Sequence, residues 1–197
     1  GNHADLRAGG MNCFQGAMPT MINVVFAGND AGMEGGGLYI ETGSVVTLVN
    51  SVVAGNAAGL GGGGIHATTG TATPLASVLW DNHPGDLAGV PSPIGAGGNL
   101  SVDPGFLDLS AADPLVWDLH LDVTSALVQA GDPAHPDPGG NPWDIGFWGG
   151  AGASDIDLDG DGAPSWWQPG PYQPGSYPAL GLDCDDLDPR VGPGDGC

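Results

Sequence analysis

Positive charge is almost absent from this sequence. Of 197 residues only two are Lys or Arg, Arg7 and Arg190, against 23 Asp and Glu, so the formal net charge is −21 at pH 7. A surface this acidic repels phosphate backbones and anionic headgroups, which excludes nucleic acid and anionic membranes as partners. The same charge favours cations as ligands.

Cysteines and long apolar runs are also scarce. Three cysteines with few other soft ligands do not make a zinc site. No apolar run approaches the length of a membrane span, so we expect no membrane insertion. No signal peptide is recognisable, and the chain starts inside a repeat and stops at Cys197, so we interpret it as part of a longer precursor.

The sequence is instead rich in glycine and contains an internal repeat. Residues 23–40 match residues 50–67 position by position at a spacing of 27. The start of the chain fits the same frame, with Asn2 falling one full period before Asn29, and a looser copy with one residue deleted surrounds Asn82. A fixed period of this length predicts a solenoid in which each repeat stacks on the next.

The composition of the repeat indicates the kind of solenoid. Its residues are mainly Gly, Asn, Val, Thr and Ala, which form helices poorly, and it lacks the leucine frame of leucine-rich repeats. Calcium-binding nonapeptide repeats require an Asp that is missing here. The sequence therefore predicts an all-β protein, a single-stranded parallel β-helix in which each rung is one repeat long. Its strands are expected at 22–26, 38–41 and 45–49, joined by glycine-rich bends.

Stacking makes specific expectations for single side chains. Equivalent residues of successive rungs should lie roughly 4.8 Å apart, the ordinary distance between strands. Asn2, Asn29 and Asn56 should then form a ladder of side-chain amides. His66 takes the strand position that Tyr39 holds one rung earlier, so we expect a stacked rung residue rather than a metal ligand.

The pattern changes after the repeats. Residues 117–123 alternate strictly between apolar and polar, which indicates a half-buried strand. The passages Ser125-Ala-Leu-Val-Gln-Ala-Gly-Asp132 and Asp144-Ile-Gly-Phe-Trp-Gly-Gly150 follow. With the preceding Gly-Asn and Gly-Gly-Gly rungs, they resemble the end of secreted bacterial right-handed β-helix proteins. The resemblance covers about residues 20–150 and implies the fold and an extracellular setting. It implies no single activity, since that family includes lyases, hydrolases and adhesins.

A second composition begins after residue 152. Asp at every second position of a glycine-broken loop points alternate carboxylates at one centre, an arrangement that suits Ca²⁺. The candidate ligands are Asp155, Asp157, Asp159, Asp161, Asp183, Asp185, Asp186 and Asp188. The twelfth position of an EF-hand register here is Trp166 or Gln168 instead of Glu, which argues against a true EF-hand.

The aspartate segment is similar to the calcium repeats of thrombospondin type 3 modules. It is more similar still to an aspartate-rich metal-binding motif of bacterial surface proteins, which 157–162, 183–189 and Cys197 match. The insertion at 163–182 departs from that motif, and its aromatic residues either cover the side of the solenoid or form a platform for sugars. Cys184 and Cys197 form either a disulfide or two free thiols.

These observations give three segments and a function. Residues 1–102 are assigned to β-helix rungs, 103–152 to the last rung and cap, and 153–197 to calcium binding. Cys13 is expected to be buried in a rung, and Asp144 to close the last rung through hydrogen bonds. We expect a secreted or cell-surface bacterial protein with a structural, adhesive or fibre-forming role. Its expected partners are calcium ions, a second copy bound through the β-helix ends, and a cell-surface glycan or protein.

A carbohydrate-active enzyme, a polysaccharide lyase or hydrolase, or a carbohydrate-binding module on a β-helix is the alternative. Lyases of this fold use Arg or Lys as a base, and Arg7 is the only basic residue within the repeats. Hydrolases need carboxylates placed together on one face. Asp30 and Glu34 share a loop, but their counterparts one repeat later are Ala57 and Gly61. The sequence therefore favours a non-enzymatic role.

Overall fold

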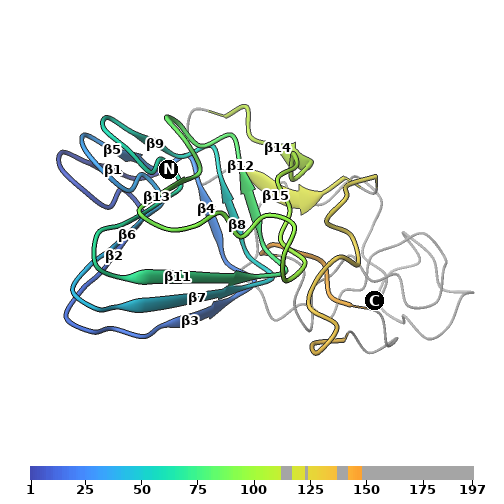
Figure 1. Ribbon diagram of the computed structural model, residues 1–197. Coiled ribbons are helices and arrows are strands. Elements are labelled where there is room, and N and C mark those ends of the chain that lie inside the picture. The colour runs from blue at the N-terminus through green and yellow to red at the C-terminus, as the bar shows by residue number, and fades with distance from the viewer. Residues whose placement is uncertain (112–116, 123, 137–141, 148–197) are drawn as a thin grey trace, which may run out of the picture. The chain divides into compact units, whose positions relative to one another are not determined.

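The computed structural model describes residues 1–111, 117–122, 124–136 and 142–147. The chain divides into two compact units, Gly1–Leu107 with Leu119–Gly150, and Asp108–Asp118 with Ala151–Cys197. Most of the second unit falls outside the described residues. The described residues contain strands and no helix, which confirms the all-β class (Figure 1). The predicted segment boundaries near 102 and 152 stay predictions.

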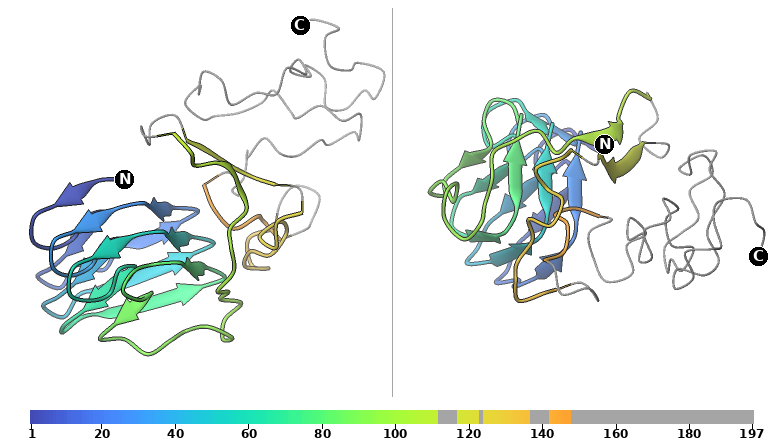
Figure 2. Two further views of the ribbon diagram at one scale, coloured as in Figure 1. Left: turned by 90° about the horizontal axis from the view of Figure 1, so that it is seen from above. Right: turned by 90° about the vertical axis from the view of Figure 1, so that its right-hand side faces the viewer.

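The strands of the described repeats pair side by side in four parallel sheets, each containing one strand from each successive repeat. Sheet 1 contains β1 (His3–Ala4), β5 (Asp30–Ala31) and β9 (Ala57–Ala58). Sheet 2 contains β2 (Met11–Cys13), β6 (Leu38–Ile40), β10 (Ile65–Ala67) and β13 (Leu87–Ala88). Sheet 3 contains β3 (Thr20–Ile22), β7 (Val45–Val49) and β11 (Thr71–Leu75). Sheet 4 contains β4 (Val25–Ala27), β8 (Val52–Ala54) and β12 (Val78–Trp80). Figure 2 shows these strands in successive layers.

The register of the sheets reproduces the repeat of the sequence. Leu38 of β6 pairs with Met11 on one side and with Ile65 on the other, which is one full period in each direction. Val52 pairs with Val78, one position short of a full period, which confirms the single deletion expected in the next copy. The period shortens further where Ile65 pairs with Leu87.

The main core lies between the inner faces of sheets 2, 3 and 4. Alternate residues of each strand point into it, so Leu38 and Ile40 are fully buried there while Tyr39 lies on the opposite face of sheet 2. Its buried members are Cys13, Phe26, Leu38, Ile40, Val46, Leu48, Val53, Ile65, Ala67 and Leu79. Cys13 is a buried free thiol, as predicted, and burial raises its pKa.

Sheet 4 is buried on both faces. Val53 and Leu79 point into the main core, whereas Val52 and Val78 contact a second apolar cluster on the other side. That cluster is completed by chain that follows the repeats, including β14 (Phe106–Asp108) and β15 (Asp118–Leu121), which pair with each other. A strand buried on both sides is typically a continuous apolar run, which explains why strict alternation is missing from this part of the repeat.

The strand predicted at 22–26 is wrong in one respect. The chain bends inside it, so β3 ends at Ile22 and β4 begins at Val25. Asn23 between them has φ of 53°, and Asn50 repeats the bend with φ of 50°. Asn tolerates this left-handed conformation because its short side chain can hydrogen-bond locally. The prediction of 45–49 is confirmed in full, and 38–41 is confirmed except for its last residue.

The glycine triplets allow neighbouring repeats to approach closely. Gly35 turns the chain with φ of 69°. A Cβ on Gly36 would lie 2.2 Å from the carbonyl oxygen of Ala57 in the next repeat. The expectation that these positions need glycine for a bend or for want of a side chain is thereby confirmed.

Candidate functional site

The eight predicted calcium ligands, Cys184 and Cys197, and the aromatic insertion lie outside the described residues. Their assignments, and that of Ca²⁺, stay predictions. Among the residues that the structure describes, no group of three or more His, Cys, Asp or Glu side chains could hold a metal ion. The candidate sites there are instead columns of polar side chains that run from repeat to repeat.

The asparagine ladder is the first of these columns. Asn29 donates from its backbone N–H and its Nδ2 to Asn56 Oδ1 at 2.9 and 2.8 Å. Asn2 repeats both bonds to Asn29. Asn56 repeats them to Asn82. The predicted ladder is confirmed and extends by one repeat.

The ladder has a direction and a defined end. Along the ladder, Nδ2 of each asparagine from Asn2 to Asn56 donates to Oδ1 of the asparagine in the following repeat. Asn82 makes its last side-chain bond to Asp86 Oδ1 at 2.7 Å. An ionised carboxylate accepts hydrogen bonds but has none to donate. The column therefore ends at Asp86 instead of continuing into a further asparagine.

A second column lies on the outer face of sheet 2. Tyr39 and His66 occupy the same register position and their rings stack with centroids 5.4 Å apart, which confirms the predicted role of His66. The guanidinium of Arg7 lies 5.1 Å from the centroid of Tyr39 on the same column. Tyr39 is 2% exposed, so this ring is covered and cannot serve as a sugar-stacking platform.

Glu34 joins the two ends of this column. Its Oε2 accepts from Arg7 Nε at 2.8 Å, and its Oε1 lies 3.9 Å from His66 Nε2. The hydrogen bond to Glu34 raises the pKa of Arg7. One carboxylate therefore contacts an arginine of the repeat before it and a histidine of the repeat after it. This arrangement holds three repeats together, and it leaves neither oxygen of Glu34 free of a basic neighbour.

Sequence reasoning missed this ion pair, although a signal for it was present. Arg7 precedes Glu34 by one repeat length, and His3 precedes Asp30 by the same length. His3 Nδ1 lies 2.7 Å from Asp30 Oδ2, and its Nε2 lies 3.4 Å from Asp5. The hydrogen bond to Asp30, followed by that to Asp5, raises the pKa of His3. Opposite charges at repeat spacing predict stacked pairs.

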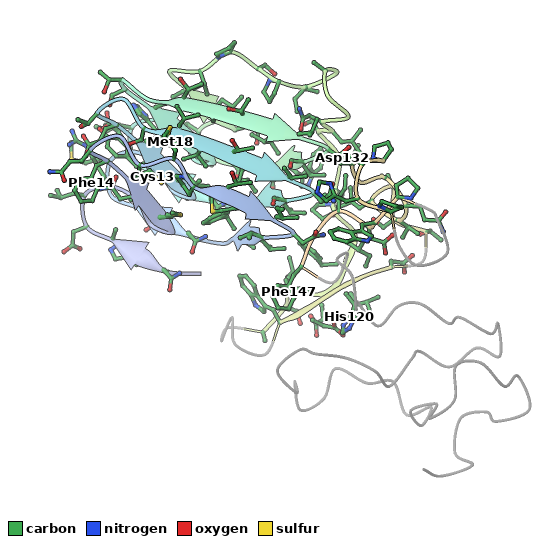
Figure 3. The ribbon with its side chains drawn as sticks, turned by 90° about the horizontal axis from the view of Figure 1, so that it is seen from below. Cys13, Phe14, Met18, His120, Asp132 and Phe147 are labelled. Carbon is green, nitrogen blue, oxygen red and sulfur yellow. The ribbon has the colours of Figure 1, made fainter. Side chains whose placement is uncertain are left out.

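The third polar site is where the chain after the repeats meets sheets 3 and 4. Asn23 Nδ2 donates to the carbonyl oxygens of Asp144 and Gly146, at 3.2 and 2.9 Å. Asp144 Oδ1 accepts from the backbone N–H of Gln129 at 2.6 Å, and its role in closing a last rung stays a prediction. Asn50 Oδ1 accepts from the backbone N–H of Asp132 at 2.7 Å. Figure 3 shows Asp132 at the strand ends opposite Phe14.

No protein-family model, curated protein or solved structure matches this chain. None of the residues that the structure describes belongs to a helix long and apolar enough to cross a membrane.

Proposed function

We propose that the four parallel sheets are the faces of a right-handed parallel β-helix in which each repeat forms one rung. The constant register between the first repeats supports this architecture, because one strand of each sheet comes from each repeat. Residues 103–152 form its last rung and cap. The burial of Leu127 and Ile145 against Val52 and Val78 supports that part of the proposal.

The function that we propose is that of an extracellular, calcium-stabilised scaffold. It would act at or outside a bacterial cell surface as a structural, adhesive or fibre-forming protein. The observation that carries this proposal is that polar side chains at repeat positions bond to the neighbouring repeat, as in Asn29 to Asn56 and Arg7 to Glu34. Side chains used in this way stabilise stacking and leave few groups for chemistry on a substrate.

Calcium is the cation that the aspartate segment is proposed to bind. Carboxylates crowded at alternate positions repel one another unless a cation neutralises them. Oxygen-only ligands favour Ca²⁺ over zinc or copper. In a chain of net charge −21 the binding of Ca²⁺ by residues 155–188 also lowers the repulsion across the molecule.

Isothermal titration calorimetry of the full chain with Ca²⁺ tests this function. We expect saturable binding that is lost in a triple variant, Asp157→Asn with Asp159→Asn and Asp161→Asn. The matched control carries Asp81→Asn, Asp108→Asn and Asp122→Asn, which remove the same charge outside the motif and should bind like the parent chain. Absence of binding heat in the parent, or equal loss in both variants, would contradict the proposal.

The proposed partners beyond calcium are a second copy of the chain, joined through the β-helix ends, and a cell-surface glycan or protein. Strand edges with unpaired backbone groups are templates for pairing. Repulsion between two acidic copies opposes this pairing, so it should strengthen when calcium is bound. Sedimentation velocity at increasing Ca²⁺ concentration should show larger species, whereas monomer throughout would remove self-association from the proposal.

A further inference from the structure

The peptide bond between Asp132 and Pro133 lies in a turn that is fixed to the repeats. The N–H of Asp132 donates to Oδ1 of Asn50, a residue with no exposed surface, at 2.7 Å. The preceding Gly131 is buried and donates to the carbonyl oxygen of Trp143 at 2.8 Å. The N-terminal side of this peptide bond is therefore held rigidly.

Three contacts converge on Asp132 from the residues after the proline. Its carbonyl oxygen accepts from the backbone N–H of His135 at 2.9 Å. Its Oδ1 accepts from the N–H of Ala134 at 3.0 Å, and its Oδ2 lies 3.2 Å from Nδ1 of His135. The Asp132 side chain is 15% exposed, and the His135 ring is further restrained by Trp143, whose centroid is 5.5 Å away.

From this geometry we propose that the chain cleaves itself between Asp132 and Pro133. A carboxylate oxygen of Asp132 attacks the carbonyl carbon of the same residue and closes a five-membered ring. The bond from that carbon to the proline nitrogen breaks, and the imidazolium of His135 gives its proton to the departing nitrogen. The products are a cyclic anhydride at residue 132 and a free secondary amine at Pro133. One water then opens the anhydride to two carboxylic acids, so the reaction consumes only water.

Each contact has a part in this reaction. The His135 N–H is placed to stabilise the negative charge that develops on the carbonyl oxygen, as a donor in an oxyanion hole does. The Ala134 N–H holds the carboxylate against its own backbone, which favours ring closure through proximity. The imidazole is the acid that protonates the leaving nitrogen. Proline is suited as the leaving residue because its nitrogen belongs to a tertiary amide and carries no N–H.

The reaction should depend on pH through the imidazole. Among the described residues, the Asp132 carboxylate is in contact with the His135 ring, and Asp144, next to Trp143, directs its Oδ1 at the Gln129 N–H. Cleavage should be faster at pH 5 than at pH 8, because the step uses an imidazolium proton for the departing proline nitrogen.

Cleavage would separate residues 1–132 from residues 133–197, which include the aspartate segment. The two fragments should remain associated under native conditions. Ile145 has no exposed surface, and Asn23 bonds to the carbonyl oxygens of Asp144 and Gly146, so the second fragment is held by the repeats. Denaturation is needed to see the cut.

The same chain contains an internal control. Asp103 also precedes a proline, and its Oδ1 accepts from the N–H of Gly105 at 2.9 Å, the counterpart of the Ala134 contact. Within the described part of the chain, no histidine contacts Asp103. Intact mass spectrometry under denaturing conditions, after incubation of the full chain at pH 5 and pH 8, should show fragments that meet at 132/133 and none that meet at 103/104.

Variants separate this reaction from ordinary acid hydrolysis. Asp132→Asn should abolish the cut. If Asp132→Asn fails to fold, Pro133→Ala is the second test, and it should reduce cleavage because the proline leaving group is removed. His135→Gln should slow cleavage about a hundredfold, within the usual range for a general acid. The control His83→Gln, at an exposed position, should cleave like the parent. Thermal unfolding checks that each variant folds. Equal cutting at 132/133 and 103/104, no cut at 132/133, or an unchanged rate in His135→Gln would overturn the proposal.

Discussion

Single buried asparagines hold neighbouring repeats in register. Asn56 is 1% exposed and uses both ends of its amide, accepting from Asn29 and donating to Asn82 and to the carbonyl oxygen of Phe26. A buried amide without partners would cost free energy, so this position is stable only when the repeats on both sides are in place. The ladder therefore makes correct stacking a condition of stability.

Replacing Asn56 by Leu should destabilise the fold by about 3 kcal/mol or more, because buried donors of Asn29 and the buried acceptor of Asn82 lose their partner. Ala57→Ser at the next position is the control and should change the free energy of unfolding by less than about 0.5 kcal/mol. Chemical denaturation monitored by circular dichroism gives both values. Equal and negligible losses would show that the ladder contributes nothing to stability.

The contact of His3 with two carboxylates contributes to the free energy of unfolding, and the sign of its pH dependence follows from the direction of the pKa shift. The pKa of His3 is raised by Asp30 and Asp5, so the folded state holds the proton more tightly than the unfolded state. The stabilisation is fully present below the pKa of an unfolded histidine, about 6.5, and is lost as pH rises through the raised value. The difference in melting temperature between the parent and His3→Gln should therefore shrink from pH 5.5 to pH 8.5. A difference that grows or stays constant would contradict this assignment.

At the scale of elements, the chain after the repeats acts as the outer cover of sheet 4. Leu127 and Ile145 are fully buried against Val52 and Val78, and the bends at Asn23 and Asn50 bond to the same segment. Without this cover, the outer face of β8 and β12 would present valines to water. The segment therefore belongs to the folded repeats and is more than a linker to the residues that follow.

Leu127→Ala tests this cover. It should cost about 2–5 kcal/mol, because it leaves a cavity in the second apolar cluster. The adjacent Val128 is 37% exposed, and Val128→Ala should change stability by less than about 0.5 kcal/mol. Equilibrium unfolding of the two variants provides the comparison. If both lose the same small amount, the segment does not pack as described.

Elements within the period were predictable because equivalent residues meet at a constant spacing. The Asn ladder, the stack of His66 on Tyr39 and the strand 45–49 all followed from the repeat. The break in the strand at Asn23 was missed. It depends on the positive φ of Asn23, and the apolar residues on either side of it are typical of a continuous strand. The cover of sheet 4 was predicted only as a cap, since its contacts join residues such as Asn50 and Asp132 that no period relates.

At the scale of the whole molecule, the repeats and the acidic segment that follows them differ in composition. Apolar burial and repeat-to-repeat hydrogen bonds stabilise residues 1–102. Residues 153–197 are proposed to order only when Ca²⁺ neutralises their carboxylates, so that binding and folding are coupled. Protonation of the aspartates at low pH should release the ion, because a protonated carboxyl is a poor ligand.

Limited proteolysis of the full chain, with Ca²⁺ and with a chelator and with the fragments identified by mass, shows whether calcium stabilises the aspartate segment. We expect 153–197 to be cut rapidly in chelator and to become resistant in Ca²⁺, while residues 1–102 resist cleavage in both. Cleavage of 153–197 at the same rate in both conditions would contradict the calcium-stabilised scaffold, as would cuts within the repeats that appear as early as those in the aspartate segment.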